Sequence, residues 1–138
     1  MDKIFKSRGS FDAYIEGSIL VTSTKGSWNV EMQRESSLQS APFVAQLEQA
    51  GKPWAVIVQV HETLLSSPEV LMAGRQSVAS MAQSSKLVAL AWVVDKQVEG
   101  YPLVVPRYKE ICAGLIKAEF FTSLAEAKAW LSLELAGA

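Results

Sequence analysis

The stretch VQVHETLLSSPEVL, residues 58–71, holds most of the side chains in this chain that could do chemistry. His61 is the only histidine, and a serine-type hydrolase would need it as general base. Glu62 follows it directly and Asp95 ends the next apolar run, so either carboxylate could orient the imidazole. An exposed histidine at the end of a strand explains the same residue without catalysis, and we prefer this interpretation.

The other common catalytic and cofactor-binding motifs are absent from the sequence. There is no G-x-G-x-x-G, no G-x-x-x-x-G-K-[ST] and no G-x-S-x-G. A metal site built from histidine and cysteine needs several of these residues, and the chain has one of each. The cysteine, Cys112, lies among apolar residues and is predicted to be a buried, inert thiol. We therefore expect no metal, no cofactor and no enzymatic activity.

Ser66 and Ser67 allow two interpretations. Ser67 precedes Pro68 and Glu69, which is the pattern of a helix N-cap followed by proline and an acidic first turn. A serine at a helix N-terminus is also a suitable phosphorylation site, because the helix end favours added negative charge. Capping alone accounts for the residue types.

Length and composition indicate one globular domain, residues 1–138, with a flexible N-terminus over residues 1–9. Hydrophobic residues make up 49% of the chain, and 13 basic against 14 acidic residues give a net charge of −1. This balance argues against nucleic acid or an anionic membrane surface as partner. The longest apolar run, residues 87–94, is too short for a membrane span, which needs about 20 residues. With one cysteine and no signal peptide, we expect a cytoplasmic protein.

The chain begins with an expected β-hairpin over residues 10–26, turning at Gly17 and Ser18. A helix follows and ends at Gly51. Pro42 inside it predicts either a kink or a second short helix that starts there. Two strands that are apolar on both faces, residues 53–60 and 87–94, belong in the centre of a parallel sheet.

Between these strands we predict a helix over about residues 68–84 and a right-handed crossover. Its buried stripe is expected to contain Val70, Leu71, Gly74, Val78, Met81 and Ala82. A short helix from about Pro106 to Ala113 follows, after an irregular segment.

The last strand, residues 116–121, precedes the clearest helix in the chain. Ser123 and Glu126 form a capping box at its start. Its apolar face should consist of Leu124, Ala127, Leu131 and Leu135. The order β-β-α-β-α-β-α-β-α predicts an α/β domain with a mixed, mostly parallel five-stranded sheet and about four helices.

This order, together with three local patterns, resembles the SpoIIAA-like family of STAS-type domains, which is grouped with Sec14-like lipid carriers. The patterns are the hairpin leading into GSWN, the strand PWAVIVQV before SSPEVL, and the ending AEFFTSLAEAKAWL. The resemblance covers nearly the whole chain and implies a non-enzymatic domain with helices mainly on one side of the sheet. In the anti-sigma-factor antagonists of this group, a phosphorylatable serine or threonine occupies the position of Ser66 or Ser67. Leu65 stands where those proteins have aspartate, and Gln59 where many members have an acidic residue.

Three functions remain under consideration. The first is a regulatory or protein-interaction module whose surface includes Ser66, Ser67 and the small residue Gly74. The second is a carrier of a small apolar, lipid-like ligand, suggested by the segment YPLVVP and by Trp28, which either closes one end of the core or lines a pocket. The third is a hydrolase that uses His61. A two-fold homodimer is a further expectation for so small a domain.

Overall fold

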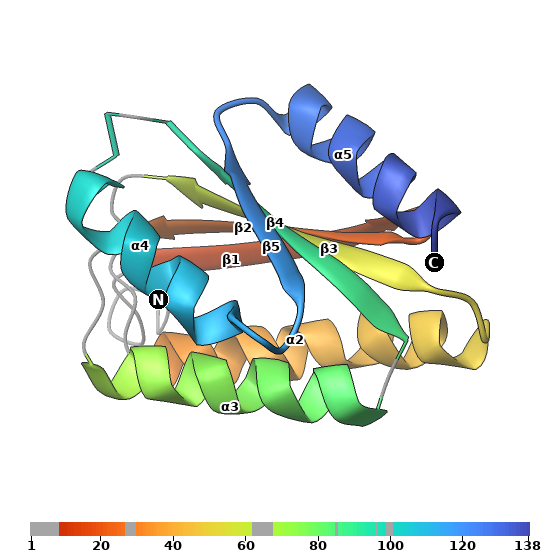
Figure 1. Ribbon diagram of the computed structural model, residues 1–138. Coiled ribbons are helices and arrows are strands. Elements are labelled where there is room, and N and C mark those ends of the chain that lie inside the picture. The colour runs from red at the N-terminus through yellow and green to blue at the C-terminus, as the bar shows by residue number, and fades with distance from the viewer. Residues whose placement is uncertain (1–8, 27–29, 62–67, 85, 96, 99–100) are drawn as a thin grey trace.

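Five strands form one sheet, and they lie across it in the order in which they occur in the sequence (Figure 1). The computed structural model describes residues 9–26, 30–61, 68–84, 86–95, 97–98 and 101–138. The strands are β1 (Gly9–Glu16), β2 (Ile19–Gly26), β3 (Trp54–His61), β4 (Leu87–Val94) and β5 (Lys117–Phe121). The helices are α2 (Val30–Gln49), α3 (Pro68–Ser84), α4 (Tyr101–Cys112) and α5 (Leu124–Ala136). The predicted α/β class, with its hairpin and mostly parallel sheet, is confirmed.

β1 and β2 form the predicted antiparallel hairpin, in which Glu16 pairs with Ile19 across a two-residue turn. Gly17, the first residue of that turn, has a φ of 62°, which glycine adopts without steric cost. β2, β3, β4 and β5 are parallel to one another. Each connection between them must therefore return along the length of the sheet, and each contains a helix.

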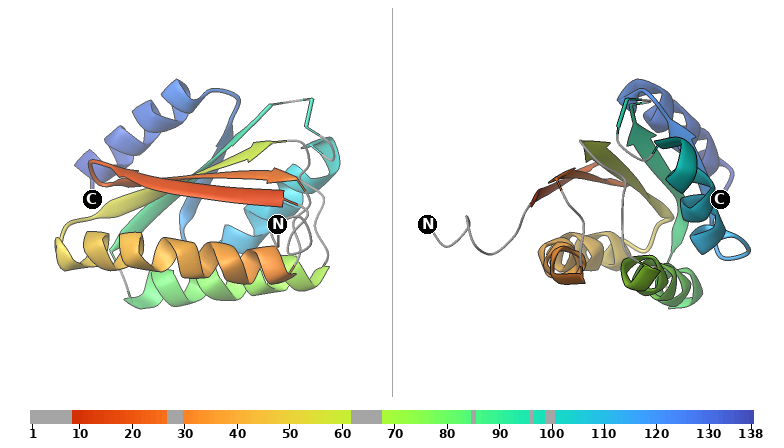
Figure 2. Two further views of the ribbon diagram at one scale, coloured as in Figure 1. Left: turned by 180° about the vertical axis from the view of Figure 1, so that it is seen from behind. Right: turned by 90° about the vertical axis from the view of Figure 1, so that its left-hand side faces the viewer.

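Helices α2, α3 and α4 pack on one face of the sheet, and α5 packs on the other (Figure 2). Each crossover advances by one strand in the same direction, and crossovers that share one hand place their helices on the same face. α5 follows β5 and does not connect two of the five described strands, so this constraint does not apply to it. It covers the face that the other three helices leave open.

Large side chains fill the core beneath α2, α3 and α4. Trp54 is fully buried, and Trp92 stacks on Phe120 with ring centroids 4.7 Å apart. Thr22 and Thr24 are buried polar residues on this face of β2. The hydroxyl of Thr22 donates a hydrogen bond of 2.9 Å to the carbonyl of Ile57, and that of Thr24 donates one of 3.2 Å to the carbonyl of Gln59. Trp54 and Trp92 are therefore core residues.

Small residues on the opposite face let α5 approach the sheet closely. Three alanines on β3 and β4 are fully buried there: Ala55, Ala89 and Ala91. Ala127 and Leu131 of α5 are fully buried against them. Every larger side chain at these positions would push the helix outward, because protein cores are close-packed.

The N-cap of α5 is the residue that the sequence predicts. Ser123 is the N-cap, and its hydroxyl accepts a hydrogen bond of 3.3 Å from the backbone N–H of Glu126. Leu124 and Leu135 are half-buried and pack on the same face as the buried pair of α5. The predicted apolar face of this helix is therefore confirmed.

The predicted helix Pro106–Ala113 is wrong at its N-terminal end, because α4 begins at Tyr101 and passes through Pro106. Four side chains at helical spacing pack on the core: Tyr101, Val105, Tyr108 and Cys112. Burial of this stripe outweighs the one backbone hydrogen bond that Pro106 cannot donate. Pro102 lies in the first turn, where helices have no partner for the backbone N–H in any case.

α2 continues through Pro42, so a second helix starting there, one of the two predicted alternatives, is wrong. The N–H that Pro42 lacks would have bonded the carbonyl of Leu38, four residues earlier. Pro42 and Leu38 are both exposed. Water can reach this side of the helix and hydrogen-bond the carbonyl, so the helix tolerates the proline.

Candidate functional site

On the face that carries α5, β2 and β3 change from apolar to polar along their length. Their first halves are buried beneath α5, through Ile19, Val21, Ala55 and Ile57. Because alternate side chains of a strand share a face, the next positions on this face belong to polar residues. We call these four residues the polar face: Ser23, Lys25, Gln59 and His61.

The register between β2 and β3 arranges the four residues of the polar face as two adjacent cross-strand pairs. Ser23 is opposite Gln59, and Lys25 is opposite His61. The Nε2 atom of His61 lies 3.0 Å from the Oγ of Ser23, and the two share a hydrogen bond, which is a diagonal contact between neighbouring strands. Lys25 and His61 are exposed. Within the described part of the chain, Lys25 forms no ion pair.

The polar face lies at the carboxyl ends of β2 and β3, the edge where open α/β sheets most often bind ligands. His61 is the last residue of β3 and is exposed, as predicted. The segments 27–29 and 62–67 follow these strand ends directly in the sequence. The candidate residues Trp28, Ser66 and Ser67 lie outside the described residues, as do Glu62 and residues 1–8.

Ser23 and His61 are close enough for a serine–histidine pair, but their surroundings differ from those of a hydrolase. Ser23 lies inside β2 between β1 and β3, so its backbone groups belong to the sheet. A hydrolase serine needs free backbone N–H groups beside it to stabilise the oxyanion. Asp95, one predicted orienting carboxylate, accepts a hydrogen bond of 2.9 Å from the backbone N–H of Gln97. Among the described carboxylates, none is hydrogen-bonded to His61.

A carboxylate that the sequence did not reveal joins three elements at the opposite end of the sheet. Glu48, at the end of α2, accepts hydrogen bonds from the indole N–H of Trp54 and from the backbone N–H of Lys86, the latter at 3.0 Å. Trp54 is fully buried, so its N–H needs this partner. Glu48 thereby links α2 to the starts of β3 and β4, a structural role.

Cys112 is buried, with 1% of its surface exposed, as predicted. Burial raises the pKa of its thiol to about 11, although the charge of Arg75 acts in the opposite direction. The thiolate is the reactive form of cysteine, so this thiol is protonated and inert at neutral pH. The candidate residue Gly74 is half-buried in α3, which packs between α2 and α4.

The segment YPLVVP, which suggested an apolar ligand, forms the first half of α4. Tyr101 and Val105 pack on the core beneath that helix, as does Val98 before it. Packing thus accounts for part of the apolar character that motivated the ligand hypothesis. Trp28, the other residue that suggested such a ligand, lies outside the described residues.

Among the described residues, no cluster of three or more histidine, cysteine, aspartate or glutamate side chains could hold a metal ion. None of the described helices combines the length and the apolar character needed to cross a membrane. Comparison with protein-family models, with curated proteins and with solved structures found no match to this chain.

Proposed function

We propose that this protein is a non-enzymatic interaction module of STAS type, which binds a protein partner through the polar face and acts in the cytoplasm. The observation that carries the proposal is the position of Lys25 beside His61 on the half of the sheet face that α5 leaves uncovered. The order of elements and the capped last helix support the STAS-type assignment. A single buried cysteine suits a reducing compartment.

The chemistry of the polar face favours a partner that presents carboxylates. An exposed ammonium group without an ion-pair partner in the described chain gains from a nearby negative charge. The amide of Gln59 can donate a hydrogen bond to a carboxylate or to a peptide carbonyl. The Ser23–His61 pair can donate one more, from the hydroxyl or from the imidazole, because its other donor is used in the hydrogen bond between them. Because the net charge of the chain is −1, its overall electrostatic field does not attract polyanions. A protein surface with a few acidic residues fits better than nucleic acid.

Ser66 and Ser67 supply the regulatory part of the proposal. They follow His61 closely in the sequence, and a phosphate adds a charge of about −1.5 to −2 at neutral pH. The phosphate would repel an acidic partner, so phosphorylation would release that partner. Ser66→Asp and Ser67→Asp should weaken partner binding, whereas Ser66→Ala and Ser67→Ala should not. Equal binding by all four variants, with no phosphate detected on either serine in cells, would remove the regulatory part.

Affinity capture from the native cells tests binding at the polar face. Wild-type protein, Lys25→Glu and a control variant, Ser132→Glu, would be immobilised and their retained proteins compared by quantitative mass spectrometry. Ser132 lies on the exposed side of α5, so its variant carries a new acidic group away from the polar face. We expect a protein retained by wild type and by the control but lost with Lys25→Glu. Identical retention by all three would contradict the proposal.

A further inference from the structure

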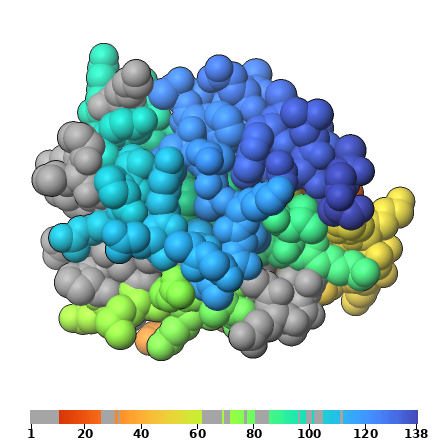
Figure 3. Space-filling model, viewed as in Figure 1, coloured from red at the N-terminus to blue at the C-terminus, as the bar shows by residue number. Residues whose placement is uncertain are grey.

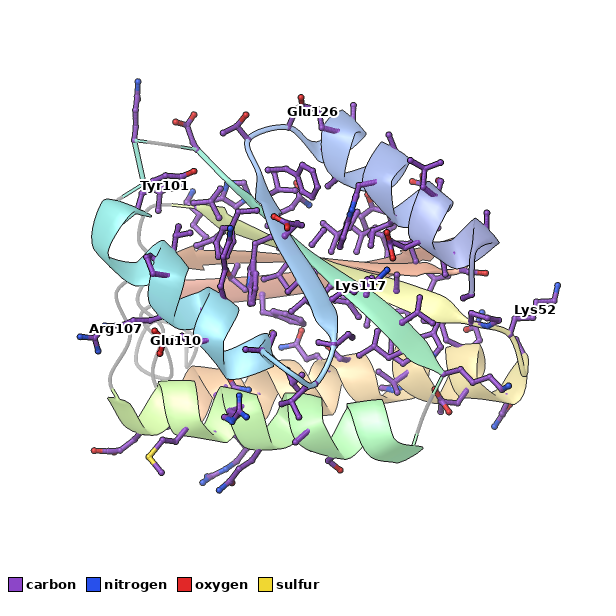
Figure 4. The ribbon with its side chains drawn as sticks, in the orientation of Figure 1. Lys52, Tyr101, Arg107, Glu110, Lys117 and Glu126 are labelled. Carbon is purple, nitrogen blue, oxygen red and sulfur yellow. The ribbon has the colours of Figure 1, made fainter. Side chains whose placement is uncertain are left out.

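The two edges of the sheet differ in how they are protected. β5 is the shorter edge strand, and its charged side chains form ion pairs with both flanking helices. Glu119 pairs with Lys109 of α4 at 3.8 Å, and Lys117 pairs with Glu134 of α5 at 2.9 Å. Figure 3 shows atoms of α4 and α5 on both sides of β5, and Figure 4 labels Lys117 there. Short length, charges and flanking helices all discourage another strand from pairing with this edge.

β1 forms the other edge and is less protected, although it also carries two charged residues, Asp12 and Glu16. It is eight residues long, and within the described chain no element lies beyond it (Figure 2). Glu16 of β1 forms an ion pair with Lys128 of α5. Among the described residues, no ion pair lies across the outer side of β1. Natural proteins usually protect a long edge strand, because its unpaired backbone groups can pair with another chain. The outer edge of β1 is therefore available to pair with another strand.

The hairpin determines which backbone groups of β1 point outward. Glu16 and Ile19 close a two-residue turn, so they form a hydrogen-bonded pair, and such pairs alternate along the antiparallel ladder. The alternation leaves Ile15, Ala13 and Phe11 without bonds to β2. The carbonyl of Ser18 agrees with this pattern, because it accepts a hydrogen bond of 3.0 Å from Ala55 of β3 and so points away from β1.

We propose that β1 pairs with β1 of a second copy of this chain, antiparallel and about a two-fold axis at Ala13. In this register Ala13 faces Ala13 of the second copy, and Phe11 faces Ile15. Asp12 then faces Tyr14, whose hydroxyl can donate a hydrogen bond to the carboxylate. Tyr14 is 47% exposed in the single chain, and pairing would cover it.

Charge selects this register among its neighbours. Moving the axis to residue 12 puts Asp12 opposite Asp12 of the second copy, and moving it to residue 14 puts Asp12 opposite Glu16. Like charges directly opposite each other destabilise a strand pair. The register at Ala13 avoids both contacts and sets Glu16 opposite Ser10, a hydroxyl.

The proposed dimer cannot add a further copy through β1. A two-fold contact uses the same edge on both copies, so joining two β1 edges leaves only β5 edges at the ends of the continuous sheet. Those edges carry the ion pairs of Lys109 with Glu119 and of Lys117 with Glu134, which oppose further growth. The apolar row of β1, which already packs on the core through Ala13 and Ile15, becomes continuous between the two copies.

Ala13→Pro tests the contact without removing a hydrogen bond from the single chain, because the N–H of Ala13 points outward and proline is tolerated on edge strands. Sedimentation equilibrium should show a dimer for wild type and for the control Ala13→Ser. For Ala13→Pro the dimer should be weaker by about tenfold or more, because both central hydrogen bonds are lost. A wild type that stays monomeric up to millimolar concentration, or an unchanged dimer with Ala13→Pro, would overturn the proposal.

A disulfide test determines the register and does not depend on proline being tolerated. Asp12→Cys and Tyr14→Cys proteins would be purified separately, mixed and oxidised. Directly opposed residues of a non-hydrogen-bonded pair lie about 4.5 Å apart at Cα, within the range of a disulfide. The mixture should give mainly the heterodisulfide that joins one copy of each variant through the two introduced thiols, with little product from either protein alone. Mainly homodisulfides, or no disulfide, would contradict the register.

Discussion

Lys25 of β2 and His61 of β3 are direct register partners, and both side chains are exposed at the carboxyl edge of the sheet. Ser23, one step inward on the same face, holds the imidazole through a hydrogen bond of 3.0 Å. The pair thus offers an ammonium group and an oriented ring on a surface that α5 leaves open. We propose that this geometry serves recognition of a carboxylate, since Ser23 lies within the sheet, where its backbone groups are paired.

The close packing of α5 predicts a strong contrast between two leucines of the same helix. Leu131 is fully buried against the alanines of the sheet, whereas Leu133 is 73% exposed. Leu131→Ala should lower the free energy of unfolding by about 2–5 kcal/mol, and Leu133→Ala should change it by less than about 0.5 kcal/mol. Urea denaturation followed by circular dichroism measures both. Equal effects would show that α5 does not pack as described.

The hydrogen bonds of Glu48 give a second stability prediction. Glu48→Leu leaves the buried indole N–H of Trp54 without its acceptor and should cost about 1–3 kcal/mol. Glu48→Gln keeps an acceptor oxygen and should cost less. Gln49→Leu is a suitable control, because Gln49 is the exposed neighbour in the same turn. If Glu48→Leu and Gln49→Leu have the same unfolding free energy, the link between α2 and the two strands is unimportant.

Cys112 makes the stability depend on pH in the alkaline range. Its pKa is about 11 in the folded protein, against 9.0 for an unperturbed thiol. Above pH 9 the unfolded chain releases this proton first, so the contribution of the neutral, buried thiol is full below pH 9 and is lost as the pH rises towards about 11. The stability difference between wild type and Cys112→Ala should therefore shrink over that interval. A constant difference, measured by denaturation at several pH values, would argue against a raised pKa.

Local signals in the sequence predicted most of the fold. The hairpin at Gly17, the cap at Ser123 and the central strands with apolar residues on both faces each depend on neighbouring residues, and each was found as expected. The start of α4 was not predicted, because Pro102 and Pro106 argue locally against a helix. Packing of Tyr101 and Val105 on a core formed by distant strands outweighs that local preference.

The site was less predictable, because it depends on the register between strands. Alternation within each strand predicts which residues of β2 share a face with Ser23 and which residues of β3 share a face with His61. The sequence contains no signal for the offset that brings Ser23 within hydrogen-bonding distance of His61. Glu48 was missed for the same reason, since its contact with Lys86 joins residues far apart in the chain.

The most direct test of the proposed function is photo-crosslinking in the native cell at two positions of the same protein. A photoreactive amino acid replaces Asp95 in one variant and Leu133, on the exposed side of α5, in the other. Asp95 is exposed and comes one residue after Val94, the register partner of Val60, so it borders the polar face while Lys25 stays intact. Binding through the polar face predicts a covalent adduct with one defined protein from position 95, and no such adduct from position 133. An adduct with that protein from position 133 alone, or from neither position, would contradict binding at the polar face.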